Sequence, residues 1–264
     1  MLRLRSRPVW IGLCTRQVGA VRVHGAAVTA LGCADVVPAF ESGTFDQGVN
    51  SLLQALEGLI DEHDLAGSRA QVVLSNRLVR YALVPFDPAH LDRHEEQALA
   101  LARLSACYGP MTDWSIRLEP ARYGRTRLAC AIPTALEQGL RALCTAHQIR
   151  LRRVSPHFVC CWNARPAAFR RAGMLAVAEC DTLLLASTDS AGWHSMRVHY
   201  ANLRDGQFDD LVYRERLMQR IDPAIPLWLD GSALPERTTL AAAGATAVRD
   251  ARPAIALAMA GRVR

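Results

Sequence analysis

Two histidines have a spacing that could support metal chemistry. His90 and His94 lie four residues apart, with Glu95 beside them, in a segment with a helical pattern. This spacing would place both imidazoles on one face of a helix. The segment lacks the glutamate that follows the first histidine in the H-E-x-x-H zinc motif, and no third ligand is indicated. We therefore interpret the pair as an exposed polar helix face and predict no metal site.

The composition excludes several catalytic classes. All 31 basic residues are arginine. A P-loop needs a lysine on its phosphates and a pyridoxal enzyme needs a Schiff-base lysine, so the chain belongs to neither class. The G-x-S-x-G motif of serine hydrolases is absent. The eight cysteines form no C-x-x-C pair and mostly have apolar neighbours, so we expect free, buried thiols. No catalytic residue is assigned.

Length, charge and apolar runs limit the number of domains, the partners and the location that we expect. The chain has 264 residues, half of them hydrophobic, which suffices for one or two domains. Its net charge is +6, but the arginines are scattered and run no further than pairs such as Arg152-Arg153, so we expect no nucleic-acid partner. The first residues lack the apolar core of a signal peptide, and no apolar run reaches the ~18 residues that span a bilayer. We expect a cytoplasmic protein.

Hydrophobic periodicity predicts an α/β chain in which three strands and a helix occur twice. The first copy has strands at 9–13, 19–24 and 26–32 and a helix at 45–64. The second copy has a strand pair within 173–188, a strand at 193–200 and a helix at 207–221. The other predicted elements are strands at 70–76, 78–86, 113–120, 126–133, 149–156 and 225–235 and helices at 88–107, from residue 134, at 156–170 and at 252–263.

Capping signals mark three of the predicted helix starts. Thr44 and Gln47 fit a capping box, as do Thr134 and Glu137. Asp87-Pro88 fits an N-cap followed by proline in the first turn.

The order of these elements resembles the actin-like ATPase superfamily, and within it the pilus platform protein PilM and its secretion relative GspL. VWIGLCTRQVGAVRV (9–23) resembles the first phosphate-binding hairpin, and PLWLDGSALP (226–235) resembles the strand and glycine loop beside the nucleotide base. VVLSNRLVRYALVPF (72–86) and RLACAIPTALEQGLRALCTAHQIRLRRVSP (127–156) resemble the entry to and exit from an inserted subdomain. The MSHA-pilus biogenesis proteins have a similar layout.

The resemblance implies an α/β, actin-like (ribonuclease H-like) two-domain fold. Actin-like domain I would cover residues 1–170, with the inserted subdomain at about 78–154, and actin-like domain II would cover residues 171–264. GspL-type proteins continue into a transmembrane helix and a periplasmic domain. Because this chain ends at Arg264, we expect a protein that docks on a separate membrane partner.

Both phosphate hairpins depart from the pattern of active members, which usually read Asp-x-Gly. Leu13 stands at the acidic position of the first hairpin, and Glu179-Cys180-Asp181 replaces the second motif. Phosphate binding in this fold needs glycine for close backbone approach and a metal to offset charge, so we predict a pseudo-ATPase without a required cofactor. The alternative is an active ATPase or sugar-type kinase of the same superfamily. ATP and magnesium would then bind at Gly12, Thr15, Glu179, Asp181 and Gly231.

Glu179 and Asp181 have two interpretations. They could hold the magnesium ion, or they could be solvated turn residues at the tip of a hairpin.

Arg80 and Tyr81 are the predicted partner-binding residues, at the root of the inserted subdomain. In the resembled proteins, a groove between that subdomain and the first domain receives the cytoplasmic tail of a bitopic membrane partner, and a strand edge suits peptide addition. The alternative is a structural arginine on a surface strand. The resemblance thus implies a component of a type IV pilus or type II secretion platform at the inner face of the inner membrane. Its partners would be a PilN-like membrane protein and an assembly motor ATPase.

Overall fold

The computed structural model describes residues 8–24, 27–37, 40, 44–87, 92–165, 172–179, 182–200 and 207–231. These residues form two compact units. The first unit consists of the described residues up to Leu78 together with Pro133–Cys160. The second consists of Val79–Ile132 and the described residues from Cys161 onward. The domain boundary expected between residues 170 and 171 stays a prediction.

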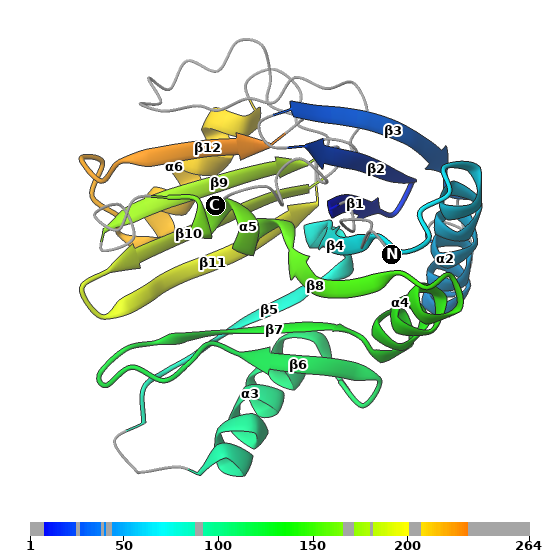
Figure 1. Cartoon of the computed structure of the whole chain (residues 1–264). Helices are drawn as coiled ribbons and strands as arrows, with labels where there is room; N and C mark the ends of the chain where they lie inside the picture. Colours follow the sequence, from blue (N-terminus) through cyan, green and yellow to red (C-terminus); the bar gives the residue numbers. More distant parts are fainter. Residues whose placement is uncertain are drawn as a thin grey trace. The chain divides into compact units, whose positions relative to one another are not determined.

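The first unit is built on a five-stranded sheet with strand order β3-β2-β1-β4-β8 (Figure 1). β2 pairs antiparallel with both β1 and β3, whereas β4 pairs in parallel with β1 and β8 pairs in parallel with β4. Helices α2 and α4 pack side by side against the sheet. The elements are β1 (Pro8–Cys14), β2 (Gln17–His24), β3 (Ala27–Asp35), α2 (Phe45–Glu62), β4 (Arg69–Leu74), η1 (Asn76–Leu78), α4 (Thr134–Ala146) and β8 (Arg150–Pro156).

Helix α5 (His157–Asn163) follows β8, and along it the chain passes from the first unit to the second.

Helix α2 shows why this part of the sequence folds as predicted. Its apolar residues recur at helical spacing, so one stripe is buried against the sheet: Val49, Leu52, Leu56, Leu59 and Ile60. The expected capping box is present, with Gln47 N donating to Thr44 Oγ1 at 3.3 Å and Thr44 N donating to Gln47 Oε1 at 2.8 Å. Both orphan donors at the helix start are therefore satisfied by neighbouring side chains.

The other two predicted capping signals were wrong. α4 begins at Thr134 itself, without a side-chain cap, and Glu137 pairs instead with Arg141 at 2.9 Å. α3 (Arg93–Tyr108) begins after Asp92, whose carboxylate accepts from His94 N at 2.7 Å and Glu95 N at 2.9 Å. The start of this helix is set by the Asp92–Glu95 capping box, in which Asp92 N also donates to Glu95 Oε2 at 2.8 Å.

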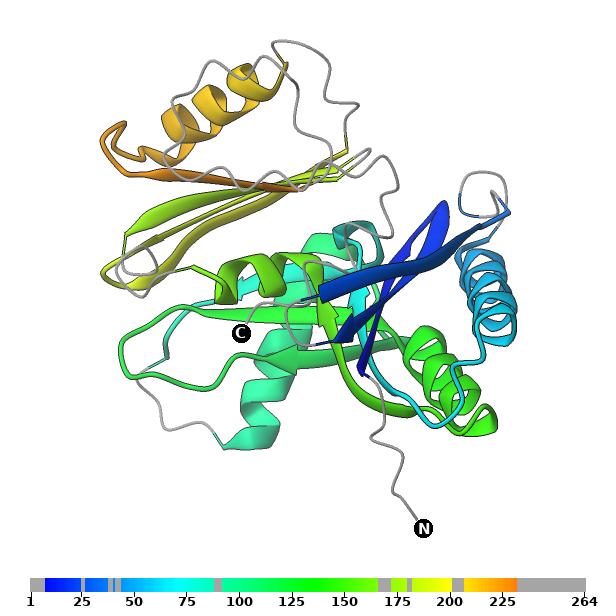
Figure 2. The same cartoon turned by 45° about the horizontal axis from the view of Figure 1, so that its top comes forward.

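The second unit contains two sheets, each covered by one helix (Figure 2). A four-stranded sheet with order β11-β10-β9-β12 packs against α6, and a three-stranded sheet with order β5-β7-β6 packs against α3. The elements are β5 (Arg80–Val84), β6 (Trp114–Leu118), β7 (Arg127–Pro133), β9 (Gly173–Glu179), β10 (Thr182–Asp189), β11 (Gly192–Tyr200), α6 (Gln207–Gln219) and β12 (Leu227–Gly231).

The predicted internal repeat is confirmed by strand pairing. β1–β2–β3 and β9–β10–β11 are both antiparallel triplets that lead into a helix. The strand after each helix, β4 or β12, then pairs in parallel with the first strand of its triplet. The chain is therefore α/β with a duplicated supersecondary unit. The predicted helix at 252–263 lies outside the described residues, and no described helix is both long and apolar enough to span a bilayer.

Two hairpin ends join the sheets of the second unit. Thr126 N donates to the Ala191 carbonyl at 3.0 Å, and Trp193 Nε1 donates to Glu119 Oε2 at 2.7 Å. Gly192 lies between these contacts with φ +103°, in the region that favours glycine. A Cβ at Gly192 would fall 2.9 Å from the Thr126 carbonyl oxygen. This junction therefore requires glycine on both steric and conformational grounds.

Replacing Gly192 with alanine should lower the free energy of unfolding by about 1–3 kcal/mol, because the new side chain meets backbone and the φ is unfavourable. Gly58 is the matched control. It lies on the exposed face of α2, and no atom lies within 4 Å of the place that a Cβ would take, so Gly58→Ala should stabilise by about 0.4–1 kcal/mol. Urea unfolding followed by tryptophan fluorescence measures both. Equal effects of the two substitutions would contradict this account of the junction.

Candidate functional site

The first predicted phosphate hairpin exists as a two-residue turn between β1 and β2. Cys14 and Gln17 face each other in register, with Thr15-Arg16 between them. Cys14 Sγ also donates to the Gln17 carbonyl at 3.1 Å, which closes the turn from the side-chain side. Gly12 lies within β1, two residues before the turn begins. The structure thus places Gly12 and Thr15 at one end of the first sheet.

Leu13 stands at the position where the resemblance described above implies an acidic residue. Its side chain is 0% exposed, among the largest fully buried side chains of the protein. Its carbonyl oxygen accepts from Ser75 N at 2.8 Å, which joins the ends of β1 and β4. A carboxylate here would lie in the apolar core without water or a partner cation. The end of β1 therefore supplies hydrophobic packing and offers no side-chain ligand for a metal.

A polar pair after β4, which the sequence analysis did not single out, organises this same edge of the first sheet. Asn76 is fully buried, and its Oδ1 accepts from Phe158 N at 3.1 Å. Ser75 Oγ accepts from Arg77 N at 3.2 Å. These oxygens satisfy backbone donors at chain turns, which is what buried polar groups require. Two polar residues directly after a buried strand were the available signal.

The second predicted hairpin is present between β9 and β10. Glu179 is the last residue of β9, is 5% exposed and pairs in register with Thr182. Gly231 ends β12 and lies opposite Ala178 in the parallel register. The structure therefore brings Glu179 and Gly231 to the same edge of the four-stranded sheet. Asp181 lies outside the described residues, and the roles of all five predicted nucleotide-binding residues stay predictions.

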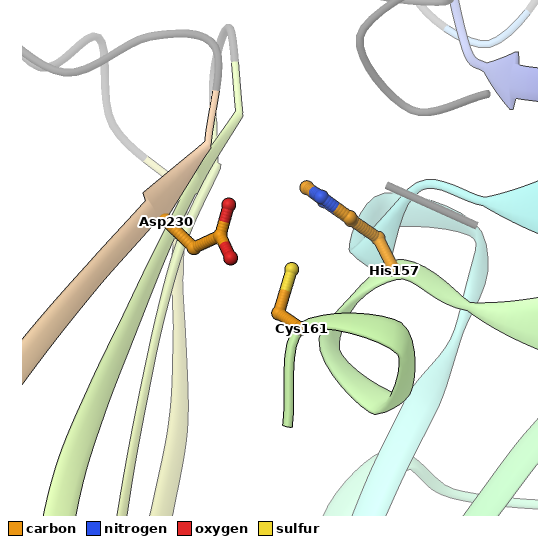
Figure 3. Close-up of side chains that lie close together, drawn as sticks. All are labelled: His157, Cys161 and Asp230. Carbon is orange, nitrogen blue, oxygen red and sulfur yellow. The ribbon is translucent and has the colours of Figure 1, made fainter. Parts of the chain in front are cut away.

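Asp230 directly precedes Gly231 and is held by an arginine. The buried Arg165 guanidinium pairs with the Asp230 carboxylate and lies 4.9 Å from the centroid of the Trp228 ring. Figure 3 shows Asp230 at the end of β12, with His157 and Cys161 projecting from α5. Cys161 Sγ and an Asp230 carboxylate oxygen lie within 4.8 Å of each other. Because Arg165 already neutralises this carboxylate and would repel a divalent cation, we assign no metal here.

Arg80 and Tyr81 begin β5, an edge strand of the three-stranded sheet. The Arg80 guanidinium carbon lies 5.5 Å from the Tyr108 ring centroid and 5.2 Å from that of Trp114. These contacts supply cation–π attraction and give Arg80 a structural role on the α3 side of the sheet. Tyr81 is only 4% exposed. Which residues bind a partner stays a prediction.

A groove of about 620 Å³ runs beside β5, between α3 and β11. Tyr108 Oη donates to the Tyr81 carbonyl at 3.1 Å, which ties α3 to β5. Burial raises the pKa of the Tyr108 phenol, which keeps the hydroxyl protonated and able to donate. The described lining residues include no carboxylate: Tyr81, Ala82, Leu83, Arg103, Ala106, Cys107, Tyr108, Met196, Arg197, Val198, His199 and Tyr200.

Sequence comparison identifies no relative, since no protein-family model matches the chain and no curated protein sequence does. Solved structures do match. A Bacteroides thetaiotaomicron protein with an actin-like ATPase fold and unknown function has a TM-score of 0.58 at 12% identity, over 89% of this chain and 87% of that chain.

Two further structures match over most of their length. The cytoplasmic domain of EpsL, an inner-membrane component of the Vibrio cholerae type II secretion system, has a TM-score of 0.56 at 13% identity, over 96% of this chain and 93% of that chain. A PilM–PilN type IV pilus biogenesis complex gives a TM-score of 0.57 at 14% identity, over 87% of this chain and 82% of that chain. The chain therefore has the actin-like ATPase fold, as predicted.

Leu13→Asp should lower the free energy of unfolding by about 3–5 kcal/mol, because it buries an unpaired carboxylate. Burial would raise the pKa of the new carboxyl, so the loss should shrink as the pH falls and the group is protonated. Leu13→Met is the control and should cost less than about 1.5 kcal/mol. Urea unfolding at several pH values measures this. A Leu13→Asp protein of normal stability that gains magnesium-dependent ATP binding would show that the position faces an open site.

Proposed function

We propose that this protein is a catalytically degenerate, actin-like component of a type IV pilus or type II secretion inner-membrane platform. It works in the cytoplasm, held at the membrane by the cytoplasmic tail of a bitopic, PilN-like partner. The observation that carries the proposal is Leu13, fully buried where active members of the superfamily hold an acidic residue. The fold similarity to EpsL and to the PilM–PilN complex supports the choice of setting.

Loss of the carboxylate bears directly on catalysis. Metal ions offset the charge of a triphosphate and stabilise the charge that develops during phosphoryl transfer. The end of β1 supplies a leucine side chain, and the oxygens of Ser75 and Asn76 are already used by backbone donors. With arginine as the only strongly basic side chain, no lysine can take over the phosphate contacts. The architecture can persist without turnover because sheet pairing and core packing hold it.

The groove beside β5 is the proposed binding site for the partner tail. β5 ends its three-stranded sheet and β11 ends its four-stranded sheet, so two strand edges line one groove. Unpaired backbone groups on a strand edge favour the addition of an extended peptide. Met196 and Val198 supply apolar contacts along β11. The geometry therefore suits a short extended segment with alternating side chains.

The positive charge of the groove lining favours an acidic peptide. Arg103 on α3 and Arg197 on β11 line the groove, and the described lining contains no carboxylate. Arg197 lies 3.3 Å from the buried Glu215, whereas Arg103 is exposed. An acidic residue in the tail would pair with the Arg103 guanidinium in bidentate fashion. We propose an extended tail in which apolar residues alternate with acidic ones.

Binding of a synthetic extended peptide in which apolar residues alternate with acidic ones, as in the proposed tail, tests the proposal. Arg103→Glu should weaken binding about tenfold or more, because attraction becomes repulsion at the groove. Arg93→Glu is the matched control on the same helix, outside the groove, and should change the affinity less than about twofold. Fluorescence anisotropy measures all three proteins. If both variants lose affinity equally, the peptide binds outside the groove. If wild type does not bind the peptide, the proposed kind of partner is wrong.

ATP binding and phosphate release distinguish the enzymatic alternative from the proposed binding role. Wild type should show no thermal shift with ATP and magnesium and no phosphate release. A shift of several degrees that Glu179→Ala abolishes, together with phosphate release, would reject the degenerate assignment and favour an active ATPase or kinase.

A further inference from the structure

A second cavity of about 450 Å³ lies in the second unit, beside the junction of the two hairpin ends. Its size is within the range of small-molecule sites. It is distinct from the peptide groove, with which it shares no lining residue. The lining combines arginines, tryptophans and neutral polar side chains: Glu119, Pro120, Arg122, Arg125, Thr126, Arg127, Trp162, Asn163, Thr188, Gly192 and Trp193.

Two of the three arginines that line this cavity are available to bind a ligand. Arg127 is committed to Glu96, with 2.9 Å between the guanidinium nitrogen and the carboxylate oxygen. Glu119 is also engaged, since its Oε2 accepts from Trp193 Nε1 at 2.7 Å and Leu128 N at 3.2 Å. Arg122 and Arg125 form no ion pair with any described residue. Guanidinium groups bind phosphate with paired hydrogen bonds, so the cavity favours an oxyanion.

The other wall of the cavity is aromatic. The Trp162 and Trp193 rings pack at a centroid distance of 4.5 Å and an interplanar angle of 43°. Trp193 is only 7% exposed and is fixed by its bond to Glu119, whereas Trp162 is partly exposed. Trp162 can therefore offer ring surface to a planar group. Stacking of a nucleobase on an aromatic side chain contributes about 1–3 kcal/mol.

Two polar side chains complete the lining. Asn163 is exposed beside Trp162 and offers an amide donor and acceptor. Thr188 is 4% exposed, and its Oγ1 has no hydrogen-bond partner among the described residues. Buried hydroxyls are rarely left without a partner, so an unsatisfied one in a cavity wall points to a ligand. Ribose hydroxyls provide the matching donor and acceptor.

We infer that this cavity binds a nucleoside monophosphate, with its phosphate on Arg122 and Arg125, its base on Trp162 and its ribose toward Asn163 and Thr188. All the named residues belong to the second unit, so the site does not include the β1 hairpin. Two arginines offset the charge of a monophosphate, so the site needs no magnesium ion. The inference does not rest on the proposed function. Such a ligand would lie where Thr126 and Gly192 join the two hairpin ends, and would therefore stabilise that junction.

Titration of the full chain with AMP, GMP, CMP and UMP in EDTA tests the inference, with tryptophan fluorescence reporting on Trp162. At least one nucleotide should bind at least about tenfold more tightly than its nucleoside or inorganic phosphate alone, because both walls contribute. The double variant Arg122→Gln/Arg125→Gln should weaken that binding about tenfold or more. Arg117→Gln, an exposed arginine on β6 outside the cavity, is the matched control and should leave it unchanged.

Three results would overturn the inference. The first is no binding of any of the four nucleotides at millimolar concentration. The second is equal affinity of the double variant and the Arg117→Gln control. The third is binding that appears only when magnesium replaces EDTA and that disappears in Glu179→Ala, which would assign the nucleotide to the actin-like position. Thermal unfolding of each variant shows whether it is folded. We expect the double variant to fold, because the Arg122 side chain is exposed.

Discussion

Packing at the end of β1 is the constraint on which the functional assignment depends. Leu13 is enclosed in the core, while the backbone around it keeps the hydrogen bonds that join β1 to β2 and to β4. Backbone pairing and side-chain chemistry are thus separable at this position. The shape of such a hairpin does not depend on whether this side chain is acidic or apolar, because the ladder depends on the main chain. The Leu13 side chain adds to the core.

Three carboxylates of the second unit are held in contacts with other side chains of that unit. Glu119 fixes the Trp193 indole, Glu96 pairs with Arg127, and Asp230 pairs with Arg165. Each of these acidic side chains has a partner within the unit. The exposed arginines that line the groove and the cavity therefore create positive surfaces suited to acidic or phosphorylated ligands.

The chain carries arginine and no lysine, so its aromatic residues can also pack against guanidinium groups. Arg80 lies near the rings of Tyr108 and Trp114, and Arg165 lies near the ring of Trp228. A planar guanidinium stacks on aromatic faces and still donates hydrogen bonds, whereas an ammonium is a compact, strongly hydrated charge. These arginines can therefore be partly buried at element ends. The same stacking explains why Arg80, chosen from the sequence for partner binding, has a structural contact in the fold.

Local pattern determined most elements of this protein. The apolar stripe and capping box of α2, the alternating strands and the repeated order of elements are properties of short segments, so the sequence alone was sufficient to predict them. The same holds for the apolar residue type at Leu13, which differs from the acidic type that the resemblance implies. Only the tertiary structure decided that Leu13 is fully enclosed, that Arg165 neutralises Asp230, and that Glu119 meets Trp193. Those contacts join residues 65 to 74 positions apart, and no local periodicity encodes which distant side chains will meet.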